Sequence, residues 1–194
     1  DPVEELIPVR PTQHYSMGGI RTKATGESPT LKGLFSAGEA ACWDMHGFNR
    51  LGGNSVAETV VAGMIVGEYV ADYCGQNSLN VSTSTIQHFM KQEEKKITDI
   101  LVRDFGENPF QLKAEMQKIM MDKVGIFRNG DDLEQAVEEL KVLNQRAKQV
   151  ALRNRISSSN PELVEAIRVP KMIKLAQCVA YGAMLRIESR GAHA

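Results

Sequence analysis

The chain has 194 residues, of which 42% are hydrophobic, and 23 Lys and Arg against 24 Asp and Glu give a formal net charge of −1. This length allows one large domain or two small ones, and the balanced charge gives no support for nucleic-acid binding, which usually leaves a basic footprint. The longest apolar run, around residues 60–66, is well short of the ~20 residues that a membrane-spanning helix needs, so no direct membrane span is expected.

The first 13 residues are rich in proline and show no helical or strand periodicity. We expect residues 1–13 to be an extended connector. Between residues 13 and 35, short apolar pieces alternate with turn residues, which predicts a β-hairpin with its loop near Gly26. Residues 34–39 are predicted to be a short buried strand. Residues 40–53, rich in Gly, His and Asn, are predicted to be a loop of the kind that carries functional sites.

A buried helix is predicted over residues 55–73. Val56, Val60 and Met64 recur at helical spacing, and the segment is apolar nearly all round. The pair Gly63 and Gly67 has the spacing of a membrane-helix dimer motif, but in so short a helix we expect close packing against a sheet instead.

The rest of the chain is predicted to be a helical bundle that follows a linker over residues 75–84. The expected helices cover residues 85–105, 110–121, 131 to about 155, and 161 to about 189. Asn160 and Pro161 are a typical helix start, whereas Pro170 predicts a kink or a break in the last helix. Met116, Ile119 and Met120 are expected on one stripe. Short connections favour antiparallel packing.

Most of the candidate functional residues lie in two segments, HYSMGGI at residues 14–20 and HGFNRLGGNSVAE at residues 46–58. His14 and Arg50 can both bind carboxylates. The neighbouring glycines, Gly18 and Gly19, let backbone N–H groups come close to a ligand.

The second segment runs into the helix predicted over residues 55–73. Ser55 and Val56 begin that helix, and the N–H groups of a first helical turn favour an anionic or electron-rich partner. Ordinary capping by Asn54 or Ser55 would be compatible with this interpretation.

These motifs, together with GLFSAGE at residues 33–39 and IESRGAH at residues 187–193, closely resemble the flavoprotein subunit of fumarate reductase and succinate dehydrogenase. The resemblance follows the family's order over essentially the whole chain and is strongest to the bacterial fumarate reductase branch. It implies the C-terminal part of such a subunit.

The implied fold is α+β. The C-terminal strands and helix of an FAD-binding α/β domain, residues 14–74, would be followed by an antiparallel helical bundle, residues 85–194, truncated at its end. Residues 1–13 would then come from a capping domain that the chain lacks.

The resemblance also implies roles for single residues. The histidine and arginine at the positions of His14 and Arg50 bind carboxylates of the substrate. Glu39 would contact the flavin cofactor, FAD, and a carboxylate there can accept hydrogen bonds from ribityl or ribose hydroxyls. Ser55 and Val56 are expected beside the flavin. Gly18 and Gly19 are expected to bring backbone donors near the substrate and the flavin, with a role in the turn alone as the alternative.

Other roles are expected outside this chain or stay open. The catalytic proton donor and the histidine that attaches FAD covalently would lie upstream, so no catalytic residue and no metal ligand is expected here. We expect Arg190 and His193 to help dock the helical region onto another domain. No role is assigned to Trp43 or His46.

The activity implied for the complete protein is the interconversion of fumarate and succinate by hydride transfer with FAD in anaerobic respiration. Its partners would be an iron–sulfur subunit and a membrane anchor subunit that exchange electrons with quinone, and its location the cytoplasmic face of the inner membrane. The alternatives are a related FAD enzyme, such as L-aspartate oxidase, adenylylsulfate reductase or succinate dehydrogenase, or a non-catalytic module that contacts a partner subunit. The isolated chain is expected to be inactive.

Overall fold

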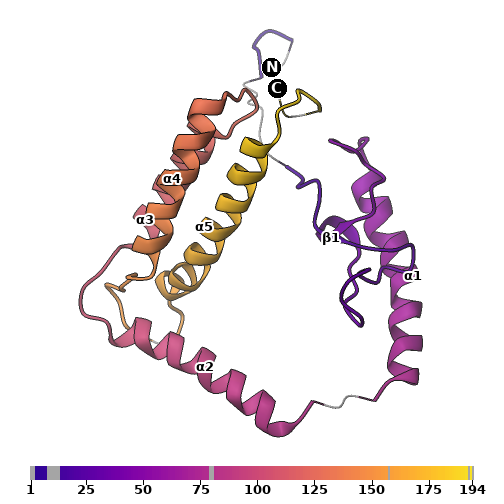
Figure 1. Ribbon diagram of the computed structural model, residues 1–194, viewed down its shortest axis with the longest axis horizontal. Helices are drawn as coiled ribbons and strands as arrows, with labels where there is room; N and C mark the ends of the chain where they lie inside the picture. The colour runs from indigo at the N-terminus through magenta and orange to yellow at the C-terminus, as the bar shows by residue number, and fades with distance from the viewer. Residues whose placement is uncertain (1–2, 8–13, 79–80, 157, 192, 194) are drawn as a thin grey trace. The chain divides into compact units, whose positions relative to one another are not determined.

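The computed structural model describes residues 3–7, 14–78, 81–156, 158–191 and 193. The chain forms two compact units, residues 1–80 and 81–194. The first unit contains β1 (Ile20–Arg21), the 3-10 helix η1 (Gly38–Ala40), β2 (Ala41–Cys42) and α1 (Asn54–Gln76). The second contains α2 (Thr83–Val102), α3 (Pro109–Lys123), α4 (Gly130–Ala147) and α5 (Pro161–Leu185) (Figure 1). The predicted α+β fold, with strands and a helix followed by a helical bundle, is confirmed.

The two strands of the first unit pair in parallel, with Ile20 opposite Ala41 and Arg21 opposite Cys42. Just before β1 the backbone comes very close to the chain before β2. A Cβ atom at Gly19, whose φ is 132°, would lie 2.3 Å from the carbonyl oxygen of Ala40. This position therefore requires glycine, and the close approach holds residues 14–19 beside η1.

The predicted hairpin is present, but its loop lies elsewhere. An antiparallel bridge pairs Glu27 with Phe35, so the loop spans residues 28–34 and not the region of Gly26. Gly26, at φ 79°, instead makes a separate turn that packs on α1, where a Cβ atom would lie 2.3 Å from a methyl group of Val66. The predicted position of the loop was wrong because the glycine serves this packing contact.

The strand predicted over residues 34–39 is not formed. Phe35 pairs only as an isolated bridge, and Gly38 adopts a left-handed φ of 69°, which turns the chain into η1. The turn packs against α1, because a Cβ atom at Gly38 would lie 3.1 Å from the hydroxyl oxygen of Thr59. The extended segment of this region is β2, which follows η1.

Helix α1 begins and ends close to the predicted helix, but its burial differs. Its buried residues share one face: Glu58, Ala62 and Val66. Val60 is 56% exposed and Met64 is 69% exposed. A Cβ atom added at Gly63 or Gly67 would meet nothing within 4 Å. The predictions of burial all round and of close glycine packing are wrong for this chain, because residues 14–50 pack against a single face of the helix (Figure 1).

In the second unit, α3, α4 and α5 lie side by side (Figure 1). Glu115 in the first half of α3 pairs with Arg146 in the last turn of α4, so these two helices are antiparallel. Lys113 and Glu165, near the starts of α3 and α5, form an ion pair of 3.1 Å, so α3 and α5 run in the same direction.

A single hydrophobic core fills this bundle. Its least exposed large side chains come from all three helices: Leu112, Leu140, Leu143, Val169 and Ile173. Burying a side chain of this kind stabilises a fold by about 1.5–3 kcal/mol. The predicted stripe is confirmed, with Met116 buried and Ile119 and Met120 packed against the core. Helix α2 has no buried residue among those described.

Helix α4 is shorter than predicted, because it ends at Ala147. The residues after it are extended and pair with the segment before α3. The N–H of Glu107 donates to the carbonyl oxygen of Gln149 at 2.8 Å, and the N–H of Ala151 donates back to Glu107 at 3.0 Å. These bonds between distant segments replace a further turn of helix.

Helix α5 starts as predicted. Pro161 is its first residue, and the Asn160 side chain accepts a hydrogen bond from the N–H of Leu163 at 3.1 Å. The helix continues through Pro170 to Leu185. The proline does not break the helix, because buried side chains before and after Pro170 pack both halves of the helix against the core.

Candidate functional site

The candidate site forms where the segment before β1, the loop after β2 and the start of α1 meet. His14 and Arg50, 36 residues apart, lie side by side, with Arg50 Nη2 3.2 Å from His14 Nδ1. A guanidinium can only donate, so Nδ1 accepts and the ring proton sits on Nε2. The pair therefore keeps an imidazole N–H and guanidinium N–H groups as donors for an anion.

Arg50 lies over an aromatic ring. Its guanidinium carbon is 4.9 Å from the centroid of the Tyr15 ring, a cation–π distance. Nη1 donates to the carbonyl oxygen of Leu51 at 3.5 Å, and the buried Nε has no hydrogen-bond partner among the described residues. The Tyr15 ring and His14 are thus the main groups that orient the guanidinium.

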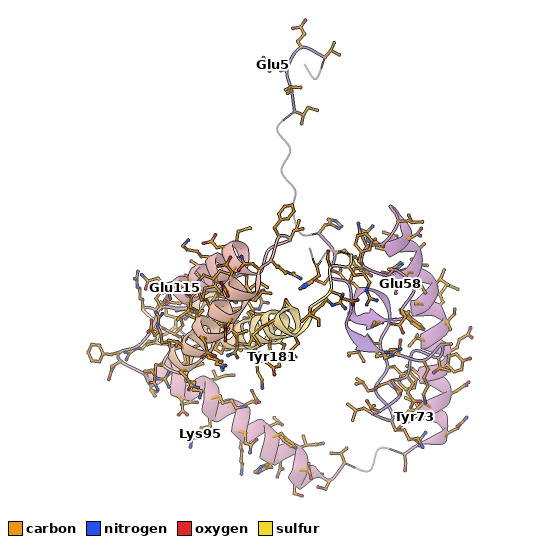
Figure 2. All side chains as sticks on the ribbon, turned by 45° about the horizontal axis from the view of Figure 1, so that its top comes forward. Glu5, Glu58, Tyr73, Lys95, Glu115 and Tyr181 are labelled. Carbon is orange, nitrogen blue, oxygen red and sulfur yellow. The ribbon has the colours of Figure 1, made fainter. Side chains whose placement is uncertain are left out.

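Tyr15 in turn contacts a buried acid that the sequence analysis did not single out. The Tyr15 hydroxyl donates to Glu58 Oε2 at 3.0 Å, and His46 Nε2 lies 2.9 Å from the same oxygen. Glu58, on α1 (Figure 2), is only 8% exposed. Burial raises the pKa of the Tyr15 hydroxyl above its ordinary value, and the bond to Glu58 raises it further. The hydroxyl therefore stays protonated at neutral pH.

A signal for Glu58 did exist in the sequence. It is the only charged residue between positions 51 and 67, in an otherwise apolar helix start. His46, which had no assigned role, is its partner.

Glu39 and the glycine turn also lie at this site. Glu39 is exposed, and its Oε1 accepts a hydrogen bond from the backbone N–H of Ser16 at 2.9 Å. Gly18, at φ 109°, has open space at its Cβ position, so a ligand could approach its backbone. Gly19 differs, because it is pressed against Ala40.

The start of α1 offers unpaired backbone donors. Its N-cap is Gly53, which is in the left-handed conformation and provides no side-chain cap. The N–H of Asn54 bonds to Leu51 at 3.1 Å, but those of Ser55 and Val56 have no partner among the described residues. Neither Asn54 nor Ser55 caps the helix with its side chain, so this terminus presents a partial positive charge.

A hollow of about 290 Å³ adjoins these groups. Its lining includes Met17, Gly18, Trp43, His46 and Glu58. Two polar atoms here, Trp43 Nε1 and Glu58 Oε1, are buried and have no hydrogen-bond partner among the described residues. His14 and Arg50 lie outside this lining.

Arg190 and His193 belong to the second unit and make contacts within it. His193 Nδ1 lies 2.9 Å from Arg128 Nη1, and its Nε2 lies 3.0 Å from the carbonyl oxygen of Arg186. Arg190 pairs with Glu188 at 3.4 Å. Their expected part in docking onto another domain stays a prediction.

Comparison with known proteins shows what the sequence and the fold are similar to. A family model described as the C-terminal region of the fumarate reductase flavoprotein matches residues 113–194, and an FAD-binding domain model matches residues 1–56. The fumarate reductase flavoprotein subunit of Helicobacter pylori (strain ATCC 700392 / 26695) is 50% identical over 187 residues. The chain belongs to the fumarate reductase flavoprotein family. The motifs at residues 14–20 and 46–58 therefore identified the family correctly.

The match covers most of this chain but a minor part of its relatives. It covers 96% of the chain and 26% of the Helicobacter pylori subunit. The fumarate reductase flavoprotein subunit of Escherichia coli (strain K12) is 38% identical, and the match covers 100% of this chain and 32% of that subunit. The chain thus spans about a quarter to a third of these relatives.

The fold agrees with that of a solved relative. A quinol–fumarate reductase solved with menaquinol molecules superposes with a TM-score of 0.91, at 38% identity, over 100% of this chain and 33% of that chain. Among the described residues, no helix combines the length and the apolar character that crossing a lipid bilayer requires.

Proposed function

We propose that this chain supplies the dicarboxylate clamp and one edge of the flavin site in a fumarate reductase that interconverts fumarate and succinate. The observation that supports this most directly is the pairing of His14 with Arg50 at 3.2 Å. The unpaired N–H groups at the start of α1 lie in the same unit.

The two side chains suit a carboxylate in complementary ways. The guanidinium of Arg50 is planar and can bind both oxygens of a carboxylate by parallel hydrogen bonds, which fixes the orientation of the substrate. His14 donates from Nε2 to the same group. As negative charge moves toward this carboxylate in the transition state, these donors stabilise it more than they stabilise the ground state.

The residues present also fit FAD. Reduced flavin carries negative charge around N1 and the neighbouring carbonyl oxygen, which matches the partial positive charge presented by the N–H groups of Ser55 and Val56. Glu39 keeps a second carboxylate oxygen for a cofactor hydroxyl, and Gly18 leaves room for a close backbone approach. Bound FAD would supply the hydride chemistry. The residue that attaches FAD covalently and the proton donor are proposed to lie elsewhere in the complete protein.

The same reasoning extends to assembly. We propose that the complete flavoprotein works with an iron–sulfur subunit and a membrane anchor subunit that exchange electrons with quinone. It would be held peripherally at the cytoplasmic face of the inner membrane through these partners. The support is the similarity to a quinol–fumarate reductase structure.

Arg50→Lys in the complete flavoprotein tests the clamp. Lysine keeps the charge but loses the planar pair of donors, so we expect roughly a 100-fold loss of fumarate turnover, the order seen when one transition-state donor is removed. Turnover is followed as oxidation of a reduced viologen, and the flavin absorbance spectrum should be unchanged.

Arg21→Lys is the matched control. Arg21 lies in the same unit, but its side chain is exposed and pairs with Asp44. Near wild-type turnover by Arg50→Lys would refute the role of Arg50. Reduction of flavin by L-aspartate but not by succinate would indicate the related oxidase instead.

A further inference from the structure

We propose that Glu58 is a positioning residue for the substrate clamp, because it holds the Tyr15 ring on which Arg50 lies and so keeps the guanidinium beside His14. This inference rests on the proposed role of Arg50 and His14. In this proposal Glu58 acts through Tyr15 and Arg50 and not by direct contact with substrate or flavin.

The burial of Glu58 is the first reason. Its side chain is 4% exposed, and taking a carboxylate out of water costs several kcal/mol unless its oxygens are well bonded. Only Oε2 is bonded, whereas Oε1 is buried without a partner among the described residues. An apolar residue would suit the helix face better for stability alone. An acid kept at such a position calls for an explanation other than stability.

The second reason is the set of segments that Glu58 joins. Through Tyr15 it holds the segment that carries His14, and through His46 it holds the loop that carries Arg50. Glu58 itself lies on α1 (Figure 2), one turn beyond the N–H groups proposed for the flavin. One carboxylate oxygen therefore connects the three segments that form the site.

The third reason is how Arg50 is held. Because its Nε has no partner among the described residues and Nη1 makes only a long bond to Leu51, the guanidinium depends on the Tyr15 ring and on His14 for its orientation. The bond from the Tyr15 hydroxyl to Glu58 holds the hydroxyl end of that ring in place. The carboxylate charge also increases electron density on the ring, which strengthens its attraction for a cation.

The test is a double-mutant cycle in the complete flavoprotein with bound FAD. Malonate, a dicarboxylate that has no carbon–carbon double bond to reduce, is the probe, and its Kd is measured from the change in flavin absorbance. Glu58→Gln keeps the size of the side chain but removes the charge. We expect the malonate Kd to rise about 10-fold, within the coupling that residues of one network show. Flavin content and Tm should stay near wild type.

If Glu58 acts by positioning Arg50, the rise in the malonate Kd caused by Glu58→Gln should disappear once Arg50 is changed. In an Arg50→Lys background, Glu58→Gln should alter the malonate Kd less than about twofold. Tyr15→Phe, which keeps the ring but loses the hydroxyl, should resemble Glu58→Gln and serves as the second variant if Glu58→Gln holds no flavin. Glu68→Gln is the control, since Glu68 is exposed on the same helix and has no ion pair among the described residues.

Three results would overturn the inference. If Glu58→Gln and Tyr15→Phe leave malonate binding unchanged while Arg50→Lys weakens it, only the role of Glu58 is refuted. Equal effects of Glu58→Gln in both backgrounds would show that Glu58 acts independently of Arg50. If Arg50→Lys itself leaves malonate binding unchanged, the clamp and the inference both fail.

Discussion

At the scale of single residues, Arg146 makes the densest set of ionic contacts in the bundle. Its Nε and Nη2 donate to the two carboxylate oxygens of Glu107 at 2.8 and 3.0 Å, and Nη2 also reaches Glu115 at 3.1 Å. The side chains of Arg146 and Glu107 are about one-third exposed. Bidentate contacts of this kind are stronger than single surface ion pairs. Through them Arg146 connects α4 to α3 and to the segment before α3.

Arg146→Met should therefore lower the free energy of unfolding by about 1–2 kcal/mol, an amount already reduced for screening by solvent. Urea unfolding of the chain, followed by far-UV circular dichroism, measures the change. Arg168→Met is the control, since Arg168 is exposed on α5 and has no ion pair among the described residues. Equal stability of the two variants would contradict the assignment.

The same contact predicts a pH dependence. The hydrogen bond from Arg146 holds the pKa of Glu107 below the ordinary value of 4.5. A carboxylate with a lowered pKa in the folded state stabilises the fold above its unfolded pKa and loses this effect as the pH falls through the folded pKa. The difference in the free energy of unfolding between wild type and Arg146→Met should be fully present at pH 7 and should become smaller below about pH 4.5. A difference that stays constant to pH 3 would exclude this origin.

The residue scale also shows what the sequence could predict of the site. The roles of His14 and Arg50 could be predicted because each residue stands among glycines in a distinctive motif. No role was predicted for Tyr15 or Glu58, although Glu58 stands out as a lone charge in an apolar segment, because a tyrosine within a motif and a glutamate in a helix both have ordinary structural explanations. Their contact joins residues 43 positions apart, which depends on the tertiary fold.

At the scale of elements, the three helices of the bundle core all start with an asparagine cap: Asn108, Asn129 and Asn160. The last is different, because Asn160 is 7% exposed. Its amide also donates to the carbonyl oxygens of Asn154 and Ile156 at 2.7 and 2.8 Å. Asn160 thus both caps α5 and holds the loop before it.

Asn160→Ala should cost about 2–3 kcal/mol, because it removes a cap and leaves two carbonyl groups with unmet hydrogen bonds. Asn129→Ala, at the more exposed start of α4, should cost about 1 kcal/mol. The denaturant midpoints of unfolding of the two variants, each measured against wild type, show how much each cap contributes to stability. Equal losses would show that the additional bonds of Asn160 contribute little.

Two glycines, Gly63 in α1 and Gly26 in the turn that packs on α1, give a second contrast. Gly63 lies in the helix with open space at its Cβ position, so Gly63→Ala should stabilise the isolated chain by about 0.5–1 kcal/mol. Gly26→Ala should destabilise it, because φ is 79° there and the methyl group would overlap Val66. Thermal unfolding of both variants tests the pair, and a loss of stability in Gly63→Ala would reveal packing on that face.

The elements also show which features sequence patterns determine. Periodicity and capping residues located all the helices of the described bundle, because these signals are local. The early end of α4 was missed, since it depends on pairing with Glu107 across the bundle. The exposure of α1 was missed because an apolar pattern does not say what covers a helix.

At the scale of the whole molecule, the proposed clamp and the proposed flavin edge lie in a chain that spans 26% of its Helicobacter pylori relative. We expect the isolated 194-residue chain to bind no flavin and to show no fumarate-dependent oxidation of reduced viologen. Both properties should be present in the complete flavoprotein. Turnover by the isolated chain would refute the proposal that the remaining catalytic groups lie elsewhere.

The contact of Gly19 with the carbonyl group of Ala40 has a practical meaning for engineering. An extra residue between Tyr15 and Gly19 would displace Tyr15 by about 3.3 Å, the rise of one extended residue, and separate it from Glu58. Residues 29–32 are all exposed, so added length there would extend into solvent. A fluorescent tag or an affinity peptide should therefore be inserted after Leu31, beyond the hydrogen bonds from the N–H groups of Thr30 and Leu31 to the buried Ser28 hydroxyl.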